Sequence, residues 1–368
     1  MKKILILLIA LVGITTFDMY TSEQNTTANK IQTRDYAIQT EASQSAIIDG
    51  AVLFSGNSNP ELAQKVAQLL NLPPVNAIVD KHNDGEIQVQ IQESIRKKDL
   101  YIIQPTCSSN QQSINDAVME LFLMIRAAKR ASAKSITVIM PYYGYARQDR
   151  KSAPRVPISA ADIALLIETA GADRILTVDL HCGQIQGFFT QIPVDNLYAA
   201  QVFIPYLNDT KNLQNVVVVS PDAGGVDRAT KFATKLAESG INSNMALINK
   251  KRAGAGKIES MDLIGDVKNA DVIIVDDLCD TGGTLIKAAE LLKNNGAKRV
   301  FAVITHPVFS NDALKKIKNS VIDEVIISDS IPLKNEKPSN VTVVSISSLL
   351  AEAIKCIHLG TSMSKLFM

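Results

Sequence analysis

Cysteine is scarce in this sequence, and neither sign of charge is in excess. Its four cysteines, at positions 107, 182, 279 and 356, form no C-x-x-C pair. This excludes the common spacing of zinc sites and a dense disulfide framework, and it favours free thiols in a reducing compartment. Lys and Arg number 38 against 37 Asp and Glu, a net charge of +1, so the overall charge indicates no nucleic-acid partner. Any anion must therefore bind at a local site.

Long hydrophobic runs are also missing, apart from one at the N-terminus. Lys2 and Lys3 precede residues 4–17, which are almost wholly apolar. This is the pattern of a signal peptide, and the run is too short for a comfortable membrane span. Residues 21–45 are rich in Thr, Gln, Asn and Ser, which is typical of a disordered linker. An amphiphilic anchor, true export and a misassigned start all fit this segment.

The rest of the chain has the composition of an ordinary globular protein. Hydrophobic residues make up 46% of its 368 residues and charged residues 20%, which is enough for two domains with normal cores. Short apolar runs alternate with segments of helical spacing. We therefore predict an α/β fold of two similar domains, each a mostly parallel sheet flanked by helices. The predicted strands are 52–56, 87–91, 101–106, 136–140, 174–181, 216–220, 245–248, 272–275, 300–307 and 321–328, and the predicted helices are 60–70, 113–131, 159–170, 227–239 and 285–292.

One segment, residues 272–284, combines features that seldom occur together. Four β-branched apolar residues run into Asp276 and Asp277, as in a buried strand that ends at the carboxyl edge of its sheet. The sequence Asp-Thr-Gly-Gly-Thr follows at 280–284, before a helical pattern. Such a loop aims backbone N–H groups and the helix dipole at one anion, and its glycines allow close backbone approach. Acids for sugar hydroxyls or hydrated Mg²⁺ beside a phosphate cradle suit a phosphorylated sugar.

Other predicted strands also end in polar residues, where an open α/β sheet places its ligands. Arg147 and Arg150 follow one strand, His181 ends the next, and Asp222 precedes a Gly-Gly pair. Guanidinium groups suit polyphosphate. Taken singly, a solvated Arg–Asp pair, a structural histidine and an ordinary turn explain them equally well. Residues 249–257, three cations and then a Gly-Ala alternation, predict a mobile loop that could close over an anion, although a solvated charge run is the usual explanation.

Together these motifs resemble the ribose-phosphate pyrophosphokinase family, which has the type I phosphoribosyltransferase fold. The resemblance runs from about Ala51 to Leu366 through D-G-E, P-Y-Y-G-Y-A-R-Q-D-R, V-D-L-H, Q-I-Q-G-F-F, S-P-D-A-G-G and V-D-D-L-C-D-T-G-G-T. It implies transfer of the β,γ-diphosphoryl group of ATP to the 1-hydroxyl of ribose 5-phosphate, with Mg²⁺, in a homohexamer that serves nucleotide biosynthesis. The sequence shows no site for a covalent nucleophile, and phosphoryl transfer depends instead on positioning and charge.

The same resemblance implies the site residues. Catalytic cations are Lys250 and Arg252, and His181 and Asp222 are the Mg²⁺ ligands. The ATP-binding groups are His82, Asp84, Glu86, Arg147, Gln148 and Asp149, with the Asp84 region supplied by a neighbouring subunit. The ribose 5-phosphate groups are Asp276, Asp277, Asp280, Thr281, Gly282, Gly283 and Thr284. We expect a signal-like segment and linker over 1–48, an ATP-side domain over 49–203, a ribose-5-phosphate domain over 204–355, and a tail over 356–368 that packs back on the first domain.

The sequence departs from the family pattern at several positions. His82 stands where a Phe usually packs on adenine, Lys251 replaces an Arg and Ala253 a Pro, and Cys182-Gly183 is an unusual pair after the histidine. Residues 150–155 look one residue short and poor in Arg for the family's phosphate-binding regulatory loop, so we predict little response to inorganic phosphate. A phosphoribosyltransferase or a non-catalytic regulatory subunit are the alternatives. Because ATP is required, we favour a catalytic body in the cytoplasm, with membrane contact only through residues 1–20 if they are retained.

Overall fold

The computed structural model describes residues 33–35, 48–254 and 257–367, with the backbone alone for 33–35 and 251–260. A five-stranded sheet in this part of the chain has the order β2-β5-β6-β7-β8, and all its pairs are parallel. Its strands are β2 (Ala51–Ser55), β5 (Asp99–Ile103), β6 (Ser135–Met140), β7 (Arg174–Val178) and β8 (Val194–Leu197). The elements between them are α1 (Pro60–Leu70), the hairpin of β3 (Ala77–Lys81) and β4 (Ile87–Ile91), α2 (Ile114–Arg130), α3 (Ser159–Ala170) and η1 (Gly183–Phe188).

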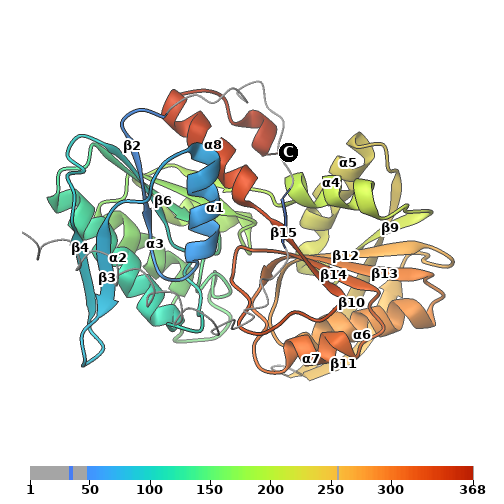
Figure 1. Cartoon of the computed structure of the whole chain (residues 1–368). Coiled ribbons are helices and arrows are strands. Elements are labelled where there is room, and N and C mark those ends of the chain that lie inside the picture. Colours follow the sequence, from blue (N-terminus) through green and yellow to red (C-terminus); the bar gives the residue numbers. More distant parts are fainter. Residues whose placement is uncertain (1–32, 36–47, 255–256, 368) are drawn as a thin grey trace, which may run out of the picture. The chain divides into compact units, whose positions relative to one another are not determined.

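The second sheet has eight described strands in the order β1-β15-β14-β13-β12-β9-β10-β11. Only its β10–β11 pair is antiparallel. Helices α4 and α5 lie on one face and α6 and α7 on the other (Figure 1). The strands are β1 (Thr33–Asp35), β9 (Val216–Ser220), β10 (Ser243–Gly254), β11 (Lys257–Ile264), β12 (Asp271–Cys279), β13 (Arg299–Pro307), β14 (Glu324–Ser328) and β15 (Val341–Ser345). The helices are α4 (Ala200–Thr210), η2 (Ala223–Gly225), α5 (Val226–Glu238), α6 (Gly283–Asn294), α7 (Ala313–Lys318), α8 (Ser347–Leu359) and η3 (Ser364–Leu366).

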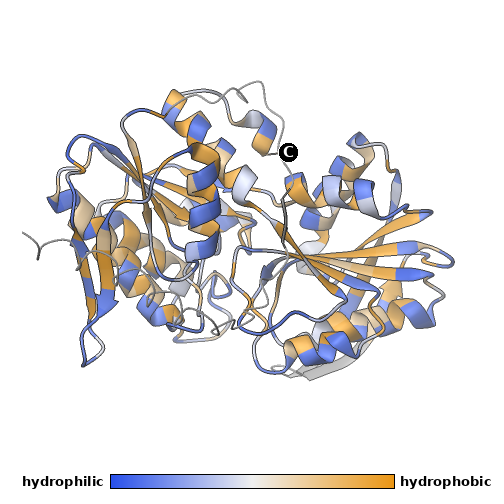
Figure 2. Cartoon of the chain, viewed as in Figure 1, coloured by the Kyte–Doolittle hydropathy of each residue, from blue (hydrophilic) through white to orange (hydrophobic). Residues whose placement is uncertain are grey.

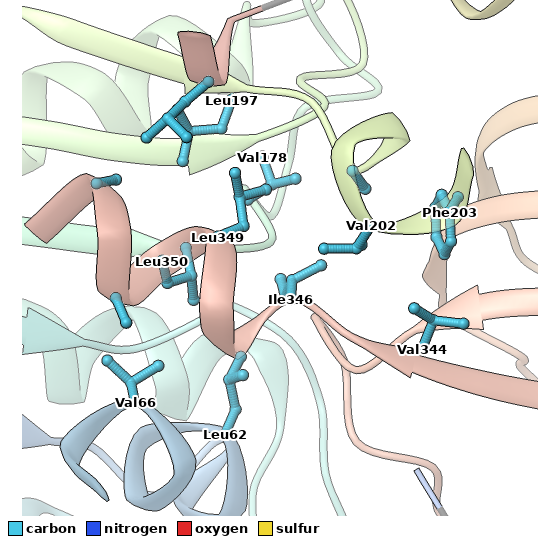
Figure 3. Close-up of a cluster of buried hydrophobic side chains, with 14 of the residues drawn as sticks. Leu62, Val66, Val178, Leu197, Val202, Phe203, Val344, Ile346, Leu349 and Leu350 are labelled. Atoms are coloured by element: carbon cyan, nitrogen blue, oxygen red, sulfur yellow. The ribbon is translucent and has the colours of Figure 1, made fainter. Parts of the chain in front are cut away.

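The central strands of both sheets are buried along most of their length. Their residues are also mostly hydrophobic, as their colour in Figure 2 shows. This is the expected composition of parallel strands that helices cover on both faces. One buried cluster contains residues of both sheets and of the helices beside them (Figure 3). In it, Leu62 of α1, Val178 of β7, Phe203 of α4, Val344 of β15 and Leu349 of α8 belong to the same core.

Local capping explains where several helices begin. Asn59 accepts a hydrogen bond from the backbone N of Leu62 at 3.2 Å, and Pro60 occupies the first turn of α1. Ser113 and Asp116 form a complete capping box at the start of α2. Such caps satisfy N–H groups that have no partner inside the helix. Helix α1 therefore begins where the sequence predicts, and α3, which has no side-chain cap, also has its predicted bounds.

The predicted fold class is confirmed, with differences in detail. The loop predicted over 249–257 is wrong for most of its length, because β10 continues to Gly254 and pairs with β11. The linker predicted over 21–45 is wrong at residues 33–35, where β1 pairs with β15. Strand β12 runs through the acid pair to Cys279 instead of ending before it. Elements β1, β3, β8, β11, β15, α4, α7 and α8 and the short helices η1, η2 and η3 were not predicted. No helix among the described residues is both long and apolar enough to cross a bilayer.

Candidate active site

The carboxyl ends of three strands supply the candidate site. Strand β7 is followed by Asp179 and His181, β9 by Asp222, and β12 carries Asp276 and Asp277. Hydrogen bonds link these groups across the two sheets, since His181 Nδ1 lies 2.7 Å from Asp277 Oδ2. His181 and Asp277, which the sequence analysis placed at separate strand ends, are therefore in direct contact.

The acid pair consists of two carboxyl groups in different electrostatic environments. Burial opposes ionisation of Asp277, but the hydrogen bond from His181 and the charge of Arg228 outweigh it and hold its pKa well below the usual range. Burial, together with the neighbouring Asp277 carboxylate, raises the pKa of Asp276. The same hydrogen bond to Asp277 raises the pKa of His181. Asp277 is therefore the anionic member of the pair to which the cations are drawn.

Arg228, in the first turn of α5, is the principal site residue that sequence analysis missed. Its Nη1 lies 3.0 Å from Asp277 Oδ1 and 3.6 Å from Asp276 Oδ1. Its Nη2 donates to the carbonyl oxygens of Leu180 and His181, both at 3.3 Å. One sequence signal pointed to it: an arginine in the first turn of a predicted helix. A cation is unfavourable beside the positive end of a helix dipole unless a local anion compensates its charge.

Lys250 is the predicted catalytic cation whose side chain the structure describes. Its Nζ lies 3.2 Å from Asp222 Oδ2, and the Lys250 side chain is 6% exposed. The other oxygen of Asp222 accepts from the backbone N–H groups of Gly224 and Gly225, at 3.0 and 3.2 Å. Strand β10 thus delivers Lys250 to the loop after β9. The side chains of Lys251 and Arg252 lie outside the described residues.

Arg147 lies beside the loop that follows β12. Its Nη1 donates to Asp280 Oδ2 at 2.6 Å. Gly282 has φ +75°, which an L side chain adopts only with strain, and it caps α6, whose first residue is Gly283. Thr281 and Thr284 are both exposed. The loop 280–284 therefore offers free hydroxyls and the N-terminus of α6 to a ligand, as an anion site requires.

Gln148 and Asp149, next to Arg147, bond to other parts of the chain. Gln148 Oε1 accepts from Ser159 Oγ at 2.5 Å, so its amide is held against the start of α3. Asp149 Oδ2 accepts from the thiol of Cys182 at 3.1 Å. Burial raises the pKa of Cys182 to about 11, so this thiol stays protonated at neutral pH and continues to donate.

A buried polar group beneath the site joins β7 to β13. Asp179, which has φ +43°, accepts from Thr305 Oγ1 at 2.7 Å and from the backbone N of Ala199 at 3.0 Å. His306 Nε2 lies 3.0 Å from the carbonyl oxygen of Val178. These contacts fix the turn that carries His181, two residues after Asp179.

The third predicted group, His82, Asp84 and Glu86, lies in the turn between β3 and β4. The N of His82 donates to the carbonyl oxygen of Glu86 at 2.8 Å, and all three residues are exposed. Within the described part of the chain, no recorded hydrogen bond or ion pair joins this turn to the strand-end residues. The structure thus brings most of the predicted site together but leaves this turn apart.

A cavity of about 980 Å³ adjoins the acid pair. It is lined by His181 from the loop after β7, Arg228 and Lys231 from α5, Asp276 from β12 and Thr305 from β13. Ligand pockets commonly have this size, with a few polar groups that converge on one region. Among the described residues, its lining includes neither the loop 280–284 nor Arg147, Asp222 or Lys250, so the cavity borders the acid pair without extending to the loop after β12.

The side chains present fit Mg²⁺ better than a metal enclosed by protein ligands. Among the side chains that the structure describes, those of residues 48–250 and 261–367, no three His, Cys, Asp or Glu are grouped so that they could hold a metal ion by themselves. Mg²⁺ typically takes one or two protein carboxylates and fills its other positions with water and substrate phosphates. Asp222 and the acid pair supply such carboxylates at the strand ends.

Comparison with known proteins identifies a family that matches most of the chain. The model of the N-terminal domain of ribose phosphate pyrophosphokinase matches residues 51–171, and that of the phosphoribosyl synthetase-associated domain matches residues 239–368. The ribose-phosphate pyrophosphokinase of Wolinella succinogenes is 48% identical over 318 residues, which cover 86% of this chain and 99% of that protein. The Vibrio cholerae protein of the same name is 50% identical over 318 residues, covering 86% and 98%.

A solved structure is similar over nearly the same length. The crystal structure of phosphoribosylpyrophosphate synthetase from Mycobacterium smegmatis has a TM-score of 0.78 and 40% sequence identity, covering 84% of this chain and 99% of that one. The similarity therefore extends over both sheets and is not limited to a single motif.

Proposed function

Because this chain belongs to the ribose-phosphate pyrophosphokinase family, we propose that it is a ribose-phosphate diphosphokinase. It transfers the β,γ-diphosphoryl group of ATP to the 1-hydroxyl of ribose 5-phosphate and forms 5-phosphoribosyl 1-diphosphate and AMP for nucleotide biosynthesis. The observation that carries this proposal is a set of three ion pairs: Arg147 with Asp280, His181 with Asp277, and Lys250 with Asp222. Each joins groups to which the proposal gives different roles: ATP and ribose 5-phosphate, Mg²⁺ and ribose 5-phosphate, and catalysis and Mg²⁺.

Ribose 5-phosphate binds at the end of β12. The loop 280–284 holds its phosphate with backbone N–H groups and the Thr281 and Thr284 hydroxyls, and Asp276 and Asp277 accept from its ring hydroxyls. Support comes from the positive φ of Gly282, which lets the loop turn tightly into α6. The sugar then lies with its phosphate at the helix and its hydroxyls at the acid pair.

ATP binds on the side of Arg147. The Arg147 guanidinium suits the polyphosphate, with Gln148 and Asp149 beside it. The turn with His82, Asp84 and Glu86 serves a neighbouring subunit, which its exposure and its separation from the other site residues support. This assignment requires an oligomer, and we propose the homohexamer of the family.

Mg²⁺ is the proposed cofactor, with His181 and Asp222 as its protein ligands. When bound, it neutralises phosphate charge and orients the diphosphate group for attack. The protein contributes positioning and positive charge. Lys250 and Arg252 stabilise the negative charge that develops on the transferred group, and the chain needs no covalent nucleophile for this reaction.

The proposed domain limits are 49–203 for the ATP side and 204–355 for the ribose-5-phosphate side, with 356–368 as a tail on the first domain. Strands β2 to β8 fall within the first range, and β9 to β15 fall within the second. The requirement for ATP supports a cytoplasmic site of action.

The test measures AMP formed from ATP and Mg²⁺, with and without ribose 5-phosphate. We expect AMP only when the sugar is present, together with an equal amount of 5-phosphoribosyl 1-diphosphate. A folded protein that binds ribose 5-phosphate but forms no AMP would be a regulatory subunit instead. A protein that consumes 5-phosphoribosyl 1-diphosphate together with a nucleobase would be a phosphoribosyltransferase.

A further inference from the structure

Arg228 joins three separate parts of the active site through a single guanidinium group. It arises from α5, contacts the acid pair on β12, and donates to the backbone of the loop after β7. Its side chain is 18% exposed. The contacts are divided between its two terminal nitrogens, with Nη1 facing the carboxylates and Nη2 facing the carbonyl oxygens of Leu180 and His181.

The charge of Arg228 compensates a cluster of acids that ranges from the buried Asp277 to the partly exposed Asp276 and Asp222. Its Nη1 lies 3.0 Å from Asp277 Oδ1 and 3.6 Å from Asp276 Oδ1, and these contacts carry the compensation. Without this cation, the carboxylates at the ends of β7, β9 and β12 would repel one another and the phosphates of an incoming ligand. His181 alone compensates Asp277 only through Oδ2, so Oδ1 depends on Arg228.

We propose that Arg228 is a positioning residue for the reaction. It fixes Asp277 by one oxygen while His181 fixes the other, and it holds the His181 backbone in place from behind. The imidazole and the acid pair are thereby aimed at the same point before a substrate arrives. This inference rests on the proposed function, because it concerns the side chains assigned there to ribose 5-phosphate and Mg²⁺.

The planar guanidinium is essential to this role. It offers several donors in a fixed fork, so it can reach a carboxylate and two carbonyl oxygens at once, whereas a lysine ammonium is a single flexible point charge. Arg228→Lys therefore keeps the charge but loses part of the geometry. Arg228→Ala loses both.

A matched control lies at the opposite end of β12, the strand that carries the acid pair. Arg299 donates from Nε and Nη2 to the two oxygens of Asp271, at 2.8 and 2.6 Å, and Asp271 is fully buried. Arg299→Ala thus also removes an arginine from a buried aspartate of β12, but far from the site residues along the strand. This variant therefore measures how much the loss of a buried arginine–aspartate pair lowers stability when the pair lies away from the ligand site.

The experiment compares wild type, Arg228→Ala, Arg228→Lys and Arg299→Ala in the full chain. It measures the Kd of ribose 5-phosphate by calorimetry, kcat and KM for both substrates, and Tm. Because a buried hydrogen bond to a charged group is worth a few kcal/mol, we expect Arg228→Ala to raise the Kd of ribose 5-phosphate about tenfold to a hundredfold. We expect an intermediate loss for Arg228→Lys and less than about a twofold change for Arg299→Ala, even with a lowered Tm. Free guanidinium at a non-denaturing concentration should restore part of the activity of Arg228→Ala only.

Two results would overturn the proposal. The first is that Arg228→Lys, and Arg228→Ala if it folds, both bind ribose 5-phosphate with a Kd within about twofold of the wild-type value. The other is a loss that Arg299→Ala shows to the same extent. If wild type binds ribose 5-phosphate but forms no AMP, the proposed diphosphokinase function fails, while the binding comparison still decides the role of Arg228.

Discussion

Replacing Lys250 by Ala tests the catalytic assignment most directly. In the structure, Lys250 Nζ lies 3.2 Å from Asp222 Oδ2, and the side chain is almost fully buried. The backbone N–H groups of Gly224 and Gly225 hold the other Asp222 oxygen. The loop after β9 therefore keeps its own anchors when Lys250 is lost, so the substitution removes a cation without dismantling the site.

The expected effect is on turnover. Losing one preorganised group that stabilises charge in a transition state costs about 10²–10³-fold in kcat, or about 2.7–4 kcal/mol. ATP affinity should change by less than about threefold, because the cation is needed mainly when charge develops on the transferred group. We would measure kcat from AMP release and the Kd of ATP with Mg²⁺ by calorimetry.

The control is Lys134→Ala. Lys134 pairs with Asp99 at 2.9 Å, its side chain is 65% exposed, and it directly precedes β6 at the amino end of that strand. A surface pair of this kind contributes about 0–1 kcal/mol, so kcat should stay at the wild-type value. The reasoning is refuted if Lys250→Ala loses ATP affinity and turnover by the same factor, or if it keeps kcat within about tenfold of wild type.

Three further outcomes are expected. Asp280→Asn breaks the ion pair with Arg147 and should raise KM for ribose 5-phosphate about tenfold, which steady-state kinetics would measure. Because the pair is partly exposed, the free energy of unfolding, measured with urea, should fall by less than about 1 kcal/mol. The short, arginine-poor segment 150–155 predicts little activation by inorganic phosphate, and strong activation of the purified protein would contradict it. Burial lowers the pKa of His306 in the folded protein. As pH falls below about 6.5, His306 therefore binds a proton in the unfolded chain but not yet in the folded one. Between that pH and the folded pKa, the free energy of unfolding should fall by up to about 1.4 kcal/mol per pH unit. The pH dependence of urea unfolding should be flatter for His306→Gln than for wild type, and parallel curves would exclude this group.

How much of the fold the sequence predicts depends on whether the signal is local. Helices α1 and α3 were predicted to the residue, because caps, glycines and apolar spacing lie within the segment itself. Strand β10 was cut short, because Lys250 to Gly254 are polar or small, and their strand state comes from pairing with β11. Strand β12 passes the acid pair because β13 pairs with it as far as Pro307. Pairing between distant segments leaves little trace in either segment alone.

The same distinction holds for the site. The Gly-rich loop and the acid pair are contiguous in sequence, so a motif identifies them. Arg228 is one of several cations on an amphipathic helix, and what sets it apart is its contact with Asp277, 49 positions further on. Only the positive end of the helix dipole made it unusual in sequence.

The pairing of the site residues explains how so many charges are held together before a ligand binds. Arg147, His181, Lys250 and Arg228 each pair with a carboxylate from another segment of the chain, so Asp280, Asp277 and Asp222 each have a basic partner among the described residues. A substrate that enters such a site exchanges one set of partners for another. On the proposed assignment, the polyphosphate of ATP takes over Arg147 from Asp280, while the phosphate of the sugar binds at the α6 N-terminus beside it. Preorganisation of this kind lowers the cost of binding and leaves the cations poised for the charge that develops during transfer.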